Sequence, residues 1–360
     1  MNKIGINELF AICFSLCVAL FPCFGTAIIL VTARNASIVT TFVGAIIGFI
    51  FLFMILYILN WNKNNNIFKN NYDNFKLFGS LFNIIYVVGF IYIEIIITWG
   101  LINFITSHLL IRNNPYVITL VLFFIIYLAI IKGKEVFSRC CLGLFYILLI
   151  VLFFTFTFLT PHVEISNLFP IIDTSFKNIG YSIYMISSFA VIPFISILSY
   201  KKNDISNEKK VNRTIYLAYI CGIICLMIFL FLIISIYGIN IASIFSYPEY
   251  YMFKKINSFN FIQRIENILS LNIFIAFFGC LCNSIYFIKT FINQTFNVKS
   301  INTKKYIVLF ITIIIPLLSI YLFKNFKITF LFRYYPIFSI VLLITLFINF
   351  IFVFIKKRIS

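Results

Sequence analysis

Residues 9–31 read LFAICFSLCVALFPCFGTAIILV and form one apolar run with Pro22 and Gly25 near its centre. A membrane-spanning helix needs about 20 mostly apolar residues, so this run is long enough to cross a bilayer. It is too long for the apolar core of a signal peptide and lacks a convincing small-residue cleavage site. We therefore expect it to stay in the protein as the first membrane helix.

The composition of the whole chain is that of a membrane protein. Apolar residues make up 62% of the 360 residues and charged residues only 11%, against about half and a quarter in soluble domains. We expect an all-α integral membrane fold of about ten transmembrane helices, forming one permease-like domain over residues 1–360. The further runs are 38–59, 78–105, 116–131, 140–160, 179–200, 214–239, 267–290, 306–323 and 334–355.

The basic residues lie in short clusters between the apolar runs. A net charge of +18 could indicate a nucleic-acid partner, but clusters of this kind are typical of cytoplasmic loops, and we expect no nucleic acid. Most of the Lys and Arg residues fall on one side if both termini are cytoplasmic. We expect segments 60–76 and 201–213 inside, and segment 240–266 outside as a loop with a surface-lying helix.

No pattern indicates an enzyme or a cofactor. The nine cysteines lie in or beside apolar runs without a CxxC pair, so we expect buried thiols and neither a zinc site nor disulfides. His108 and His162 do not complete an acyltransferase-like HxxxxD pattern, because Asn113 and Asn167 stand in place of the acid. A glycine-rich phosphate loop is also missing from the sequence.

Two of the apolar runs contain interruptions near mid-membrane. In the first run Pro22 removes a helical hydrogen bond and Gly25 permits unusual dihedral angles. In the sixth run Ser187 and Ser188 precede Pro193. Interrupted helices at corresponding places in two halves indicate an inverted-repeat transporter. We therefore expect a 5+5 inverted repeat with broken helices 1 and 6, the first repeat covering about 9–160 and the second about 179–355.

The interruptions also predict a binding site for a small solute. Free N–H groups at Gly25 and Thr26 could hold a carboxylate, and free carbonyl groups near Phe21 and Ser187 could hold an ammonium group. The alternative is that Pro22 and its counterpart in the sixth run are ordinary kinks, which are common in membrane helices.

Glu94 is the only acidic residue deep within an apolar run. It lies roughly 24 Å from the cytoplasmic start of its helix, at a height similar to that of the first interruption. A carboxyl group inside a membrane indicates a functional site, such as a proton-coupling or ammonium-binding group, or else a protonated acid hydrogen-bonded between helices. Asn283 and Ser284 are further candidates, although polar residues of this kind often only join helices.

Short motifs along the chain resemble those of the spore germination permease family, the B subunits of germinant receptors, within the amino acid/polyamine/organocation superfamily. The motifs are NPYVI at residues 114–118, KGKEVFSR at 132–139, NLFP at 167–170, NKI at 2–4 and AR at 33–34. The resemblance implies a ten-helix fold with a central pocket for an amino acid or similar nutrient. It also implies the cell membrane or spore inner membrane as the location, and other germinant receptor subunits as partners besides membrane lipids.

We therefore expect a permease-like protein that binds an amino acid or similar small nutrient without a cofactor, acting as the germinant-sensing B subunit of a receptor. The alternatives are an amino-acid transporter coupled to H⁺ or Na⁺, and a non-transporting assembly subunit. The expected ligand-binding residues are Pro22, Gly25, Thr26, Glu94, Ser187, Ser188 and Asn283.

Overall fold

The computed structural model describes residues 3–61, 64–111, 113–256, 266–267, 270–298, 300–325 and 328–359, without the side chains of 323–332 and 358–359. In this part of the chain the fold is all-helical, and the one extended pairing is an isolated bridge between Ile4 and Ile205. Among the described residues, eight helical runs are long and apolar enough to cross a membrane. The protein is therefore a multi-pass α-helical membrane protein.

Each of the ten predicted runs forms helix, with ends that differ from the prediction by several residues. The largest difference is in α4, which begins at Ile67 and bends at Lys76, where the φ angle is +46°. The helices that make up these runs are α1 (Ile6–Val18), α2 (Thr26–Ala33), α3 (Ser37–Trp61), α4 (Ile67–Phe104), α5 (Pro115–Ile131), α6 (Lys134–Leu159), α7 (Phe176–Val191), α8 (Val211–Ala242), α11 (Leu271–Thr295), α12 (Ile301–Asn325) and α13 (Ile328–Ile359).

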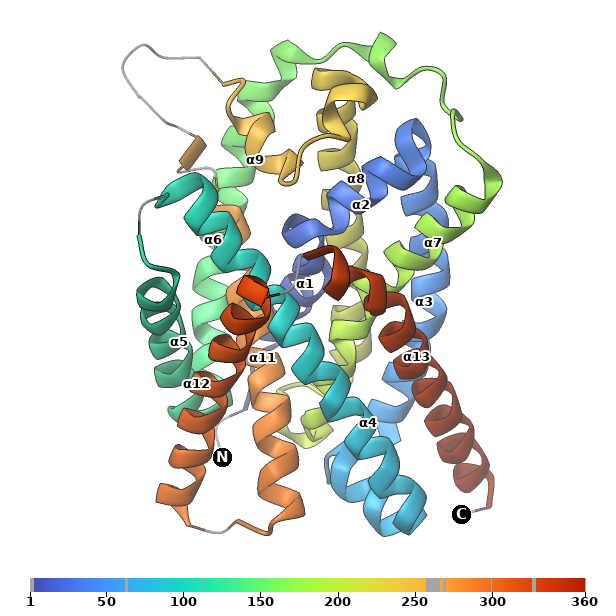
Figure 1. The fold of residues 1–360 in the computed structure, drawn as a ribbon. Coiled ribbons are helices and arrows are strands. Elements are labelled where there is room, and N and C mark those ends of the chain that lie inside the picture. The colour runs from blue at the N-terminus through green and yellow to red at the C-terminus, as the bar shows by residue number, and fades with distance from the viewer. Residues whose placement is uncertain are drawn as a thin grey trace.

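The first helical run reverses direction within its length. It extends from Ile6 to Trp61, 56 residues in all, which at 1.5 Å per residue is more than twice the thickness of a bilayer core. The reversal falls at Arg34, where φ is +51°. Figure 1 shows α2 leading up to this turn and α3 returning beside it. This run thus contains two of the predicted spans.

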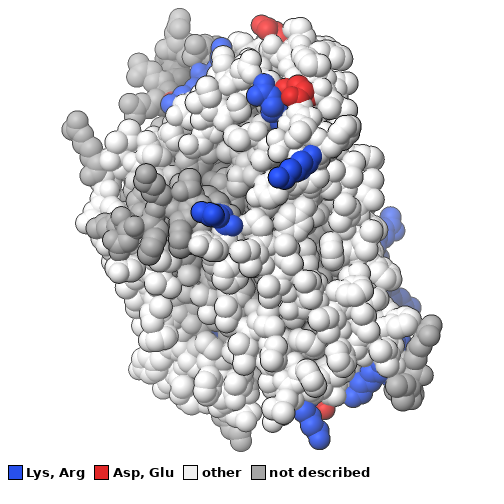
Figure 2. Space-filling model, turned by 45° about the vertical axis from the view of Figure 1, so that its right-hand side comes forward, with Lys and Arg blue, Asp and Glu red and all other residues white. Residues whose placement is uncertain are grey.

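Helix α1 lies at the centre of the bundle (Figure 1), where it packs against α6, α7, α8 and α11. Residues 11–17 are buried on every side of this helix, as expected for a helix that is apolar all round. By contrast, α3 exposes Phe42, Ile46 and Phe53 to the surroundings. The face drawn in Figure 2 carries few charged side chains, which suits contact with lipid.

The N-terminal segment and the loop 201–213, both predicted to be cytoplasmic, meet the turn before α6 at one end of the molecule. The Ile4 N–H donates to the Asp204 carbonyl at 2.9 Å, and the Ser206 N–H donates to the Ile4 carbonyl at 2.9 Å. Lys134 Nζ lies 2.6 Å from Asp204 Oδ2. The N-terminal segment, the turn before α6 and the loop near residue 204 therefore share one face of the protein.

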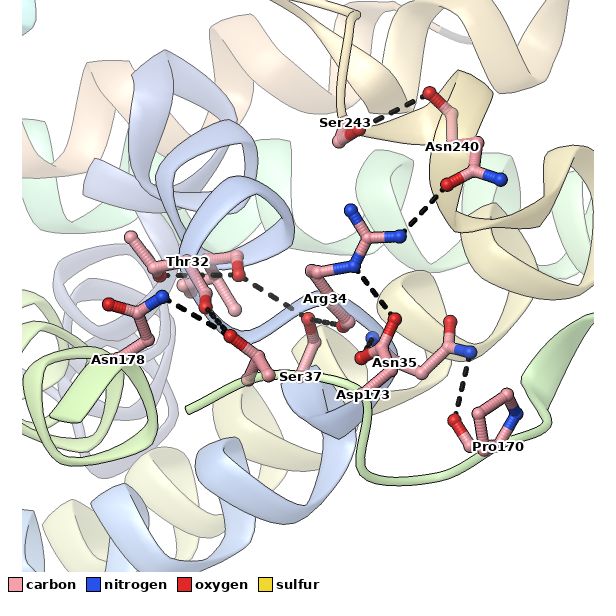
Figure 3. A network of polar contacts seen from close by, with 11 residues as sticks. Thr32, Arg34, Asn35, Ser37, Pro170, Asp173, Asn178, Asn240 and Ser243 are labelled. Atoms are coloured by element: carbon pink, nitrogen blue, oxygen red, sulfur yellow. Dashed lines mark hydrogen bonds and ion pairs between the residues drawn. The ribbon is translucent and has the colours of Figure 1, made fainter. Parts of the chain in front are cut away.

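At the other end a polar network holds the turn between α2 and α3 (Figure 3). Arg34 Nε lies 2.7 Å from Asp173 Oδ2, and Arg34 Nη2 donates to Asn240 Oδ1 at 2.8 Å. The main-chain N–H of Asn35 donates to Asp173 Oδ1 at 3.2 Å. Asp173 thereby joins the segment before α7 to the turn, while Asn240 joins the turn to α8.

The prediction of a surface-lying helix in segment 240–266 is wrong for the described residues of that segment. Helix α9 (Pro248–Phe253) is short, and its Glu249, Met252 and Phe253 side chains are buried. Just before this helix, the hydroxyl of Tyr247 donates to the Gly100 carbonyl of α4 at 3.2 Å and so ties the segment to the bundle. Residues 257–265 of the same segment lie outside the described residues.

Replacing Asp173 with Ala should lower the melting temperature of the purified protein by a few degrees. The change removes a partly exposed ion pair and the acceptor of the Asn35 N–H, together about 1 kcal/mol. Asp73→Ala, at an exposed acid without an ion pair among the described residues, is the matched control. Equal melting temperatures for both variants would show that the network does not stabilise the fold.

Thiol labelling of intact cells tests the orientation of the bundle. Lys209 is exposed in the loop predicted to be cytoplasmic, and Ser166 is exposed at the opposite end. An impermeant maleimide should label Ser166→Cys but not Lys209→Cys, because only the latter loop is predicted to face the cytoplasm. Labelling of Lys209→Cys from outside would reverse the topology.

Candidate functional site

The interruption in the first membrane helix is a single π-helical turn, Phe21–Gly25, between α1 and α2. The N–H of Thr26 donates to the carbonyl of Phe21, and the Thr26 hydroxyl reaches the same carbonyl at 3.3 Å. A free N–H group at Thr26 and a free carbonyl group at Phe21 were expected, and this prediction is wrong. Pro22 has no N–H to donate, and the wider turn restores main-chain bonding immediately after it.

Gly25 lies where α7 approaches this turn most closely. A Cβ atom at Gly25 would stand 2.9 Å from the Leu20 carbonyl oxygen and 3.2 Å from Phe189 Cδ2. The ring of Phe189 meets the edges of Phe21 and Phe24 at centroid distances of 5.9 and 5.5 Å. The space beside Gly25 is therefore filled by aromatic rings, and only a residue without a side chain fits there.

Ser187 and Ser188 are buried near the end of α7, just before the helix tightens into the 3₁₀ segment Ile192–Ser199. Their hydroxyls donate to the Tyr184 and Met185 carbonyls, each at 2.8 Å. Both hydroxyls are thus bonded within their own helix. The structure brings this region against the Phe21–Gly25 turn through Phe189.

Glu94 is fully buried on α4, and neither carboxyl oxygen has a hydrogen-bond partner among the described residues. Ser284 of α11 is a polar neighbour of this carboxyl group, but the Ser284 hydroxyl also makes no hydrogen bond of ordinary geometry with the described residues. The Cys23 thiol lies 3.6 Å from the Ile96 carbonyl oxygen. Glu94 and the Phe21–Gly25 turn therefore lie at neighbouring levels of the bundle.

Asn283 serves a separate polar network. The Tyr200 hydroxyl donates to Asn283 Oδ1, and Asn283 Nδ2 donates to Ser196 Oγ. Both ends of its amide thus join α11 to the 3₁₀ segment after α7. Asn283 and Ser284 are adjacent in sequence but have different polar neighbours.

A cavity with about 60 Å³ of space for water-sized molecules borders the same turn on another side. Its lining includes Pro22, Glu249 of α9 and Asn272 of α11. Burial raises the pKa of the Glu249 carboxyl to about 7. Hydrogen bonds with the Thr26 side chain and with the main chain of Glu249 lower this pKa, but by less than burial raises it.

Glu249 and Asn272 were not predicted as site residues. Residues 247–253 read YPEYYMF, and an acid inside such an aromatic stretch is a signal of burial that could have indicated Glu249. The position of Asn272 near the start of a membrane helix offered no comparable signal.

Comparison with known proteins relates this architecture to spore germination. The family model described as spore germination protein matches residues 3–328. The "Putative spore germination protein YfkT" of Bacillus subtilis (strain 168) is 24% identical over 228 residues, 63% of this chain. The match spans 62% of the length of that relative. Because the family model covers most of the chain, this protein belongs to the spore germination protein family.

Proposed function

We propose that this protein is the permease-like, germinant-sensing B subunit of a spore germination receptor, that it is not an enzyme, and that it binds an amino acid or similar small nutrient. Family membership supports a role in germination, and the long apolar helices support a place in a membrane. The location is then the spore inner membrane or the cell membrane, with both termini in the cytoplasm. Other receptor subunits are the expected protein partners.

The proposed architecture is a 5+5 inverted repeat of ten spans. The count of ten requires two spans within the Ile6–Trp61 run and a span by the 17-residue helix α5, which is at the short end of the spanning range. The halves are residues 9–160 and 179–355. The π-helical turn Phe21–Gly25 and the 3₁₀ segment Ile192–Ser199 then occupy corresponding places in them, which supports this assignment.

The observation that carries the proposed ligand is the unpartnered carboxyl group of Glu94. A buried carboxylate needs an opposite charge or a proton, because the membrane interior offers no water to solvate it. The ammonium group of an amino acid would provide that charge, with the Ser284 hydroxyl as a second acceptor. The rest of the ligand would then lie toward Gly25 and Thr26.

Ligand entry beside Gly25 requires movement of aromatic rings. Phe21, Phe24 and Phe189 fill that space, and Tyr335 packs on Phe189 at a centroid distance of 4.8 Å. We therefore propose that this is a closed state and that ligand binding displaces Phe189. The same packing favours the second candidate, a non-transporting assembly subunit, which would keep this space filled.

Glu94→Gln should weaken amino-acid binding at least ~10-fold, because the amide keeps the shape of the side chain but cannot pair with an ammonium group. Ligand-dependent thermal stabilisation of the purified protein, measured across a panel of amino acids, tests this. Membrane abundance should stay close to that of the parent. Unchanged binding would assign Glu94 a purely structural role.

Phe189→Leu should shift the ligand preference toward larger amino acids, because it opens space beside Gly25. The matched control is Phe124→Leu in α5, where the parent ring is 60% exposed on the outer face of the bundle. The same binding panel provides the measurement. If Phe189→Leu has the preference of the parent, the ligand does not occupy this space.

A further inference from the structure

The cavity beside Pro22 lies on a distinct face of α1. Phe14, Val18 and Phe21 line it, and their spacing of four and three residues places them on one side of a helix. Cys23, in contrast, contacts Ile96 of α4, and Gly25 faces Phe189 of α7. The cavity is thus separated from the region of Glu94 by the interrupted helix itself.

Two polar side chains in the cavity wall have unmet hydrogen-bonding capacity. Glu249 is 6% exposed and Asn272 is 8% exposed. Glu249 Oε2 and both polar atoms of the Asn272 amide have no hydrogen-bond partner in the part of the chain that the structure describes. Buried polar atoms without partners are unfavourable, so these three atoms in the wall of one cavity indicate a bound polar molecule.

The character of the wall restricts the chemistry of that molecule. Apart from Glu249 and Asn272, the described lining is formed by apolar and cysteine side chains and Pro22, without a basic residue. One carboxyl group and no base favour a cation over a zwitterion or an anion. A bare metal ion such as Ca²⁺ or Mg²⁺ takes about six or more oxygen ligands, whereas the described side chains supply only three oxygens.

The size of the cavity restricts the molecule further. A water molecule needs about 10–15 Å³ of such space, so the cavity of about 60 Å³ holds a compound of roughly four or five non-hydrogen atoms. An ammonium group donates up to three hydrogen bonds, which suits Glu249 and Asn272 Oδ1 as acceptors. A short alkyl group suits the rings of Phe229 and Phe253 in the wall.

We propose that this cavity is a second ligand site, separate from the Glu94 region, and that it binds a small protonated aliphatic amine. Glu249 and Asn272 bind the ammonium group, and the apolar wall binds the alkyl chain. Glu249 and Asn272 are not among the residues proposed for the Glu94 region, although Thr26, which is proposed for that region, neighbours Glu249.

Calorimetric titration of the purified full-length protein with n-propylamine tests the proposal. The titration is made at about pH 8, where the amine is protonated. n-Propanol is the uncharged analogue of the same shape, and L-alanine is a small zwitterion with two more non-hydrogen atoms. Propylamine should bind saturably and raise the melting temperature, whereas the other two should bind this site at least ~10-fold more weakly.

Variants connect the binding to the cavity. Glu249→Gln should weaken propylamine binding at least ~10-fold, and Ala276→Leu should abolish it by filling the cavity that Ala276 lines. Glu208→Gln, which removes an equal charge from an exposed loop, should leave it unchanged. If Ala276→Leu does not yield folded protein, Asn272→Leu replaces it, with a loss of affinity expected.

Three results would overturn the proposal. They are absence of saturable propylamine binding, equal affinity in the parent and Glu249→Gln, and binding of propanol or alanine as tight as that of propylamine with the same sensitivity to Ala276→Leu. Because propylamine binding is measured directly, its failure leaves the amino-acid binding assay with Glu94→Gln unaffected, and the two proposals are tested separately.

Discussion

The structure depends on one constraint: within a bilayer, every main-chain polar group must find its partner inside the protein. The π-helical turn at Phe21–Gly25 shows how the constraint is met where Pro22 prevents regular bonding. The Thr26 N–H closes a wider ring onto Phe21, and the chain continues as helix. The buried hydroxyls of Ser15 and Thr155 follow the same rule, since they donate to carbonyl groups of the preceding turn.

Some buried side chains lack such partners. Glu249 lines the cavity beside Phe21 and Pro22, Glu94 lies on α4, and each has at least one carboxyl oxygen without a partner among the described residues. Both are buried from solvent, and each is placed by a different element, α4 in one case and α9 in the other.

Much of the fold could be predicted because the length of an apolar run is a local property of the sequence. The ten runs became helices, with a π-helical turn at residues 21–25 and a 3₁₀ segment at residues 192–199. The free groups predicted at Thr26 and Phe21 were wrong, because sequence cannot show how a wider turn rearranges bonding. The burial of α9 was missed because it depends on Gly100 and Tyr247, 147 positions apart. The proposed ligand positions likewise depend on side chains that are far apart in the sequence and close in space.

The central place of α1 has a consequence for biosynthesis. Its partners α6, α7, α8 and α11 all follow it in the chain, so the innermost helix leaves the ribosome before the helices that surround it. It must therefore reside in lipid without its neighbours while they are made. Its single charged side chain, Glu8, lies in the first turn, so the rest of the helix can remain in hydrocarbon during that interval. The apolar side chains that later form the core of the bundle therefore first keep α1 stable in lipid before its partner helices are made.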